Sequence, residues 1–269
     1  MADVVLIVLR RPEAVPALLQ AGQRMATLMG GARLNVLAIR EPIHVTGLAA
    51  EALIAEAVLV VRDRAQEEQR VAASRTAFDR WVGETGSDAH WIETEGSATA
   101  IIGERGSRAD LIVSGQPFED DRLARQAFSA ALFGTDRPVL LVPRECGALF
   151  GRRVAIAWRD EKRAISAVMP ALRCLGNAEQ VHVLMGVRDK ASEPSMPKVL
   201  AEHGITAQLH AVPIGSEPLG KTLLDTARQL AADMLVMGAY AHSPLRELIL
   251  GGVTRYVVDY TDLPVLMRH

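Results

Sequence analysis

The stretch ADLIVSG at residues 109–115 returns as ADMLVMG at residues 232–238. Each copy is an acid, an apolar run and a glycine, which predicts a buried parallel strand that ends in a turn. Two further pairs agree in the same order: VVLIVLRR at 4–11 with RVAIAWRD at 153–160, and TDRPVLLVP at 135–143 with TDLPVLMRH at 261–269. Three matched pairs in one order indicate duplication of a whole fold unit.

Each copy predicts strands alternating with helices, and therefore a parallel sheet covered by helices on both faces. We expect an α/β protein built from two tandem doubly wound five-stranded sheets, each with strand order 3-2-1-4-5. The units should span residues 1–147 and 151–269, joined by a glycine-containing stretch that follows a completed strand. Strands are expected near 3–9, 33–39, 89–94, 110–115, 138–142, 153–158, 179–186, 206–212, 233–237 and 264–267.

The composition excludes several classes of protein. The formal net charge of -2 offers no basic field, so nucleic acid is not expected as a partner. Cys146 and Cys174 are far apart in sequence, which argues against a disulfide framework or a cysteine zinc site. The apolar run at the N-terminus is too short to span a bilayer, so we expect no membrane association and a soluble, cytoplasmic protein.

A ligand would bind at the carboxyl ends of the first and fourth strands of a unit, where the strand order reverses. In the second unit Gly238 follows the fourth strand, and Gly251 and Gly252 should break the helix that Ser243 and Pro244 begin. A new helix starting near Val253 would present free N–H groups to an anion. The residues expected to contribute are Gly252, Val253 and Thr254 through their amides, the Thr254 hydroxyl, and the Arg246 charge.

At this loop the sequence resembles the universal stress protein family. ATP-binding members carry G-x-x-G, nine residues, then G-[S/T], and here Gly238, Ala241, Gly251 and Gly252 keep that spacing. Ala241 replaces a glycine, and Gly252 replaces the hydroxyl residue. The resemblance implies a pocket for ATP, ADP or AMP, with Mg²⁺ only as the companion of ATP.

The resemblance also implies an adenine site near the end of the first strand. Ala157, Trp158, Arg159 and Asp160 occupy this position, with Arg159 where the family often has an Asp and Asp160 one residue later. Met237 matches an apolar residue that lines the nucleotide pocket in the family. Tandem members usually pack as an internal pseudo-dimer, and the final strands of the two units are the expected contact because an exposed edge strand invites pairing. A homodimer of the whole chain stays open.

The corresponding loop of the first unit is acidic. Glu119, Asp120 and Asp121 stand where phosphates would arrive, so we hypothesise that the first unit binds no nucleotide and serves as a structural partner. Two histidines, His182 and His210, lie on predicted strands where they could meet across the sheet, although the sequence does not favour zinc there.

No catalytic constellation emerges from the sequence. The leading hypothesis is therefore a regulatory stress-response protein that binds adenine nucleotide in its second unit, with hydrolysis slow or absent. The alternative is a nucleotide-independent interaction or scaffold protein with a vestigial loop, which the departures at Ala241 and Gly252 favour. A true nucleotide hydrolase is a third hypothesis.

Overall fold

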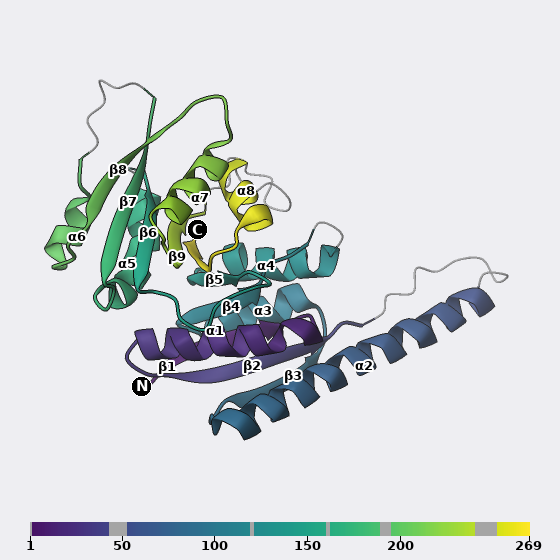
Figure 1. Ribbon diagram of the computed structural model, residues 1–269. Coiled ribbons are helices and arrows are strands. Elements are labelled where there is room, and N and C mark those ends of the chain that lie inside the picture. Colours follow the sequence, from purple (N-terminus) through teal and green to yellow (C-terminus); the bar gives the residue numbers. More distant parts are fainter. Residues whose placement is uncertain (1, 43–52, 119–120, 160–161, 189–194, 240–251) are drawn as a thin grey trace.

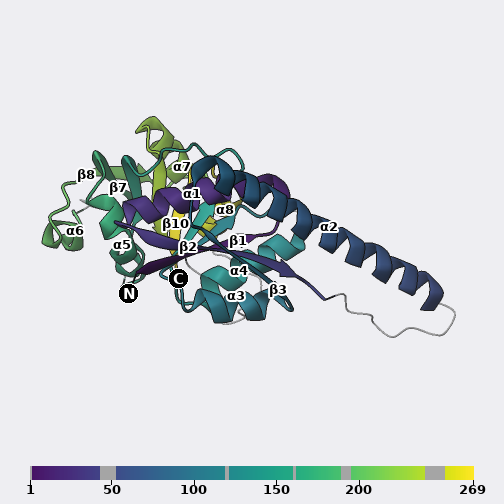
Figure 2. The same cartoon turned by 90° about the horizontal axis from the view of Figure 1, so that it is seen from below.

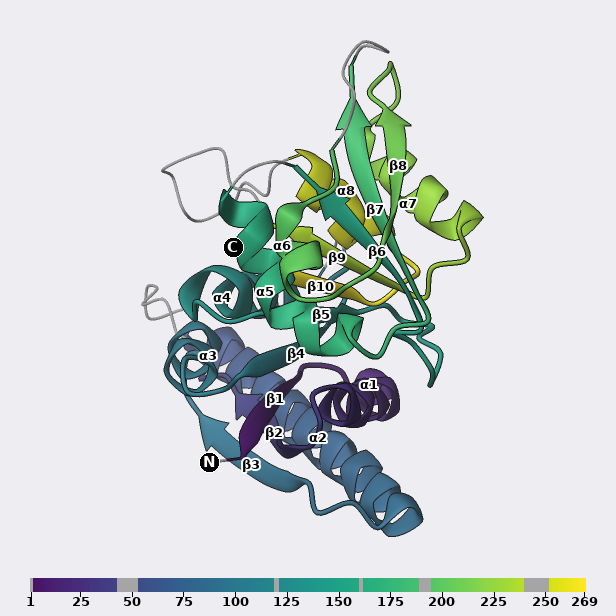
Figure 3. The same cartoon turned by 90° about the vertical axis from the view of Figure 1, so that its left-hand side faces the viewer.

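The computed structural model describes residues 2–42, 53–118, 121–159, 162–188, 195–239 and 252–269. Ten strands form one sheet in the order β3-β2-β1-β4-β5-β10-β9-β6-β7-β8 (Figures 1 and 3). The strands are β1 (Asp3–Leu9), β2 (Ala32–Arg40), β3 (His90–Glu95), β4 (Leu111–Gly115), β5 (Val139–Val142), β6 (Arg153–Trp158), β7 (Gln180–Val187), β8 (Gln208–Pro213), β9 (Met234–Gly238) and β10 (Val265–Arg268). Each set of five follows the expected order 3-2-1-4-5.

The two five-stranded sets are parallel internally and meet through one antiparallel pair. β5 and β10 pair with Leu140 opposite Leu266, which confirms the predicted contact between the two final strands. This pairing joins the two five-stranded sheets into one continuous sheet of ten strands. Pairing the two edges satisfies backbone groups that would otherwise remain exposed.

Helices cover both faces of the sheet, as the alternating pattern predicted. On one face α1, α2, α5 and α6 pack over a core that includes Phe78, Phe150 and Trp158. On the other face α3, α4, α7 and α8 cover a second core. The helices are η1 (Pro12–Ala14), α1 (Val15–Leu28), α2 (Leu53–Thr85), α3 (Ala98–Gly106), α4 (Arg122–Gly134), α5 (Lys162–Leu175), α6 (Lys198–Glu202), α7 (Leu219–Gln229) and α8 (Gly252–Tyr260).

The long helix α2 extends well beyond the rest of the molecule (Figures 1 and 2). Its 33 residues agree with the uninterrupted run of helix formers in the sequence. None of the helices in the described ranges is long and apolar enough to cross a membrane.

The repeated acids of the sequence accept hydrogen bonds from backbone amides in both halves. Asp110 accepts a hydrogen bond from the Val4 amide at 2.8 Å. Asp233 accepts from the amides of Gly151, Arg152 and Arg153 at 2.8 to 3.2 Å. In each half the residue before the fourth strand thus ties it to the beginning of the first strand.

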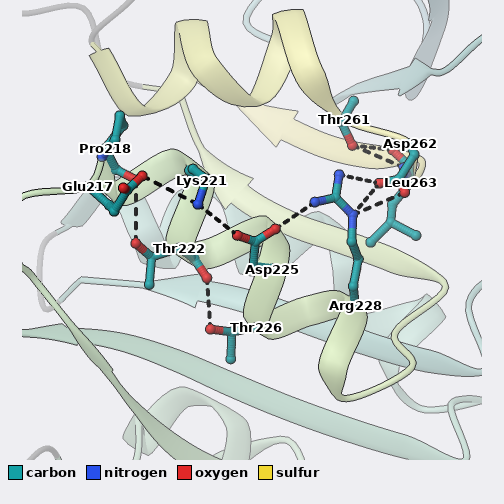
Figure 4. Close-up of polar contacts among 10 residues, drawn as sticks. All are labelled: Glu217, Pro218, Lys221, Thr222, Asp225, Thr226, Arg228, Thr261, Asp262 and Leu263. Atoms are coloured by element: carbon teal, nitrogen blue, oxygen red, sulfur yellow. Dashed lines mark hydrogen bonds and ion pairs between the residues drawn. The ribbon is translucent and has the colours of Figure 1, made fainter.

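The repeated threonines also have matching roles. Thr135 and Thr261 are buried, and each accepts a hydrogen bond from the amide two residues ahead, at Arg137 and Leu263 respectively. Such side-chain turns replace a backbone turn just before the proline and the final strand. In the second half Arg228 of α7 pairs with Asp262 in the same turn, which joins the helix to this connection (Figure 4).

Candidate functional site

The structure brings together the carboxyl ends of the first and fourth strands of the second half. β6 and β9 are parallel neighbours, with Ala157 opposite Met237. Trp158 and Gly238 are therefore the last residues of adjacent strands. Ala157 is half-buried, whereas Trp158 and Met237 are buried. Apolar side chains from both strands therefore lie where the crevice is expected.

The helix expected to face this crevice begins at Gly252, one residue before the predicted start. Gly252 is exposed, and a Cβ at this position would meet none of the described residues within 4 Å. Val253 is half-buried, and Thr254 is fully buried, so the side chains of this first turn point in different directions. Four predicted site residues lie outside the described residues: Asp160, Ala241, Arg246 and Gly251. Arg159 is described and exposed.

Close packing against α7 fixes the position of α8. A Cβ on Gly220 would lie 2.7 Å from the Tyr256 Cβ and 3.0 Å from the Val253 carbonyl oxygen. Real Cβ atoms do not approach other atoms so closely, so the two helices can approach to this distance only because residue 220 is glycine. α7 also carries a run of ion pairs, in which Lys221 bridges Glu217 and Asp225 (Figure 4).

In the crevice of the first half, the structure describes one of the three acids of the loop, Asp121. Asp121 caps α4 by accepting from the Ala124 amide and pairs with Arg11 at 2.8 Å. Burial by itself raises the pKa of Asp121, but the hydrogen bonds from Ala124 and Arg11 outweigh it and hold the pKa below its usual range. One of the three carboxylates is therefore neutralised locally, and Glu119 and Asp120 lie outside the described residues.

Arginines and an aromatic ring occupy this first crevice. The guanidinium carbons of Arg11 and Arg144 lie 4.3 and 4.4 Å from the centroid of the Phe118 ring, a distance typical of cation–π contacts. Arg10 lines the same pocket as Arg11, Phe118 and Arg144, and it pairs with Glu41. Sequence reasoning did not single out these arginines, although the Arg10–Arg11 pair directly follows the first strand, where crevice residues are expected.

The two strand histidines meet as predicted. Nδ1 of His182 lies 3.1 Å from Nε2 of His210, across the pair of β7 and β8. His182 is buried, and its Nε2 has no hydrogen-bond partner among the described residues. Across the described part of the chain, no group of three or more His, Cys, Asp or Glu side chains is placed to hold a metal ion.

Part of this sequence matches a known protein family. Residues 178–269, which include β9 and α8, match the model of the universal stress protein family. This match identifies a universal stress protein domain at residues 178–269, and it supports a role in the stress response. A search of curated protein sequences finds no match to the chain.

Solved structures extend the likeness of fold to both halves. A universal stress protein from Archaeoglobus fulgidus DSM 4304 superposes with a TM-score of 0.65 at 16% identity, covering 99% of this chain and 96% of that chain. A functionally unknown protein from Pseudomonas aeruginosa PAO1 gives a TM-score of 0.57 at 15% identity, covering 99% and 92%. These likenesses cover nearly the whole chain and show a shared fold for both halves.

Proposed function

We propose that the second half of this universal stress protein binds an adenine nucleotide, ATP, ADP or AMP, in a regulatory rather than a catalytic role. The observation that carries the proposal is the adjacency of the β6 and β9 carboxyl ends, with α8 starting at Gly252. In open α/β sheets ligands bind outside the carboxyl ends of the strands at such a switch point. The free amides at a helix N-terminus attract phosphate.

The residues at the ends of β6 and β9 and at the start of α8 fit an adenine nucleotide in two respects. Ala157, half-buried beside the buried Met237, offers an apolar surface for a base, and no described residue lies within 4 Å of the Gly252 Cβ position, which leaves room for a phosphate to approach the backbone. The spacing from Gly238 to Gly252 supports the proposal further, since it keeps the length of the family's phosphate loop. Mg²⁺ would enter only with ATP.

Substitution at Gly252 tests the proposal with a matched control. Gly252→Glu places a carboxylate at the helix N-terminus, where it favours the helix but repels a phosphate. We expect it to weaken ATP binding in isothermal titration by roughly tenfold or more, since each ~1.4 kcal/mol is tenfold in affinity. Gly83→Glu makes the same change at an exposed glycine of α2, where a Cβ would meet no described residue within 4 Å, and it should bind ATP as the unchanged chain does. Equal affinity of the Gly252→Glu and Gly83→Glu variants would move the site away from α8.

A nucleotide-independent scaffold is the second candidate, and one observation favours it. Trp158, a large side chain, is buried at the end of β6, and Arg159 stands where the family often carries an acid. Mass spectrometry of the purified chain after gentle denaturation separates the two functions. Co-purified adenine nucleotide supports the nucleotide-binding role, whereas no nucleotide and no ATP titration signal support the scaffold. An ATP hydrolysis assay addresses the remaining distinction between binding and catalysis.

A further inference from the structure

The C-terminal end of α8 is held by the first half of the chain. The Gln116 side-chain amide donates to the carbonyl oxygens of Val258, Asp259 and Thr261 at 2.9, 3.3 and 3.3 Å. These carbonyls belong to the last turn of α8 and the residue after it, where an α-helix leaves its carbonyls without internal partners. One side chain from the first half therefore satisfies the end of a helix in the second half.

An ion pair reinforces this contact. Arg125 of α4 lies 3.1 Å from the Asp259 carboxylate, whose side chain is only 8% exposed. The same guanidinium donates to the Phe118 carbonyl oxygen at 3.1 Å. Arg125 thus connects the loop after β4 to α8, and a positive charge near a helix C-terminus is favourable to the helix dipole.

A cavity adjoins these contacts. Its volume is about 230 Å³, and it is lined by Gln116, Pro117, Phe118, Arg125, Asp259 and Tyr260. Because this space separates part of the β4 loop from the end of α8, polar contacts take the place of continuous apolar packing there. Loss of the polar contacts would therefore leave this end of α8 with few restraints from the first half.

The internal repeat shows that the two halves use the position of Gln116 differently. Gln116 follows Gly115 as Ala239 follows Gly238, and the amides of Gln116 and Ala239 donate in the same way, to Val142 and Arg268. In the second half this position begins the loop of the proposed phosphate site. In the first half the residue at the equivalent position, Gln116, instead holds the C-terminal end of α8.

We propose that Gln116 and Arg125 are positioning residues for the second half, and that the first half acts as a clamp fixing α8 for the ligand at its N-terminus. This inference rests on the proposed nucleotide-binding function. It predicts that the ligand affinity of one half depends on side chains of the other half that never touch the ligand.

The test uses the full chain and variants on the first half. Gln116→Glu keeps the size of the side chain but replaces the donor amide with a carboxylate that repels carbonyl oxygens. We expect its ATP dissociation constant to rise roughly fivefold or more, the usual scale of coupling between sites. Arg125→Met should act in the same direction, and Arg125→Lys should retain part of the affinity. Arg137→Met, which removes an exposed arginine bonded to Ser107 within the first half, is the matched control.

Hydrogen exchange without nucleotide separates positioning from general destabilisation and from failure of the nucleotide proposal. In Gln116→Glu the amides of α8 should exchange faster, while those of β1 and β6 keep their rates. Faster exchange in α8 with no ATP binding by the unchanged chain would uphold the clamp and overturn the nucleotide site. Where the unchanged chain binds ATP, an equal affinity in Gln116→Glu would overturn the clamp. Unchanged exchange in α8 would also overturn it, and so would faster exchange across all elements.

Discussion

Leu140 lies opposite Leu266 at the middle of the antiparallel pair that joins β5 to β10. The two side chains are 0% and 1% exposed, and they belong to the same apolar cluster. This cluster contains residues of both halves, from Val5 to Val236, so the halves share one core layer across the seam.

Truncation at the seam should therefore destabilise the whole chain. Leu140→Ala or Leu266→Ala removes a fully buried side chain, and such changes cost roughly 2–5 kcal/mol of unfolding free energy. Urea denaturation followed by circular dichroism measures the loss. Leu149→Ala, at a side chain 69% exposed, is the control and should change the free energy of unfolding little. Two well-separated unfolding transitions in the seam variants, with one unchanged, would show that the halves fold independently.

The paired acids predict unequal losses of stability. Within the described ranges, Asp233 accepts from three backbone amides, whereas Asp110 accepts from the Val4 amide alone. Hydrogen bonds to charged groups contribute roughly 1.5–3 kcal/mol, less where the site is exposed to water. Asp233→Ala should therefore lower the free energy of unfolding more than Asp110→Ala does, in the same denaturation experiment. An equal loss at both positions would contradict this account of the repeat.

The close contact between α7 and α8 predicts that any larger residue at Gly220 destabilises the protein. Gly220→Ala would place a methyl group 2.7 Å from the Tyr256 Cβ and 3.0 Å from the Val253 carbonyl oxygen, so α8 must move. We expect a loss of roughly 1–3 kcal/mol, the usual cost of overpacking. Thermal unfolding measures it, and Gly103→Ala on α3, whose nearest atom would be 4.0 Å away, is the control. The control should be neutral or stabilising, since alanine favours a helix more than glycine does.

The histidine pair predicts a dependence of stability on pH. Burial lowers the pKa of His182, and His210 and Arg153 lower it further. A histidine whose pKa is lower in the folded state binds more protons when unfolded, so stability rises with pH. The stabilisation is complete above the unfolded value of about 6.5 and is lost as the pH falls through that value towards the lower folded pKa.

Variants of the pair measure this effect. The unchanged chain should lose unfolding free energy between pH 8 and pH 5.5, and His182→Gln should lose less over the same interval. His90→Gln, at an exposed position on β3, is the control and should keep the pH dependence of the unchanged chain. Parallel pH profiles for His182→Gln and the unchanged chain would assign the dependence to other groups.

Local sequence determined the strands, the helices and the repeat. The apolar runs at 109–115 and 232–238 mark buried strands wherever they occur, and the matched order of three blocks implies two copies of one unit. From these the positions of Ala157 and Met237 at neighbouring strand ends could be predicted, because strand order follows from the fold class. The contact between the two final strands could be predicted because exposed edge strands invite pairing, whereas its antiparallel direction is a finding of the structure.

The tertiary structure alone decided which polar groups meet. Gln116 reaches Val258 across 142 residues, and Arg11 neutralises Asp121 across 110 residues. No periodicity or spacing encodes such contacts, because they depend on how two complete units dock and on which rotamers their packing leaves open. Sequence therefore fixes each unit through local burial and propensity, whereas the link between the units arises only when distant side chains are brought within hydrogen-bond distance.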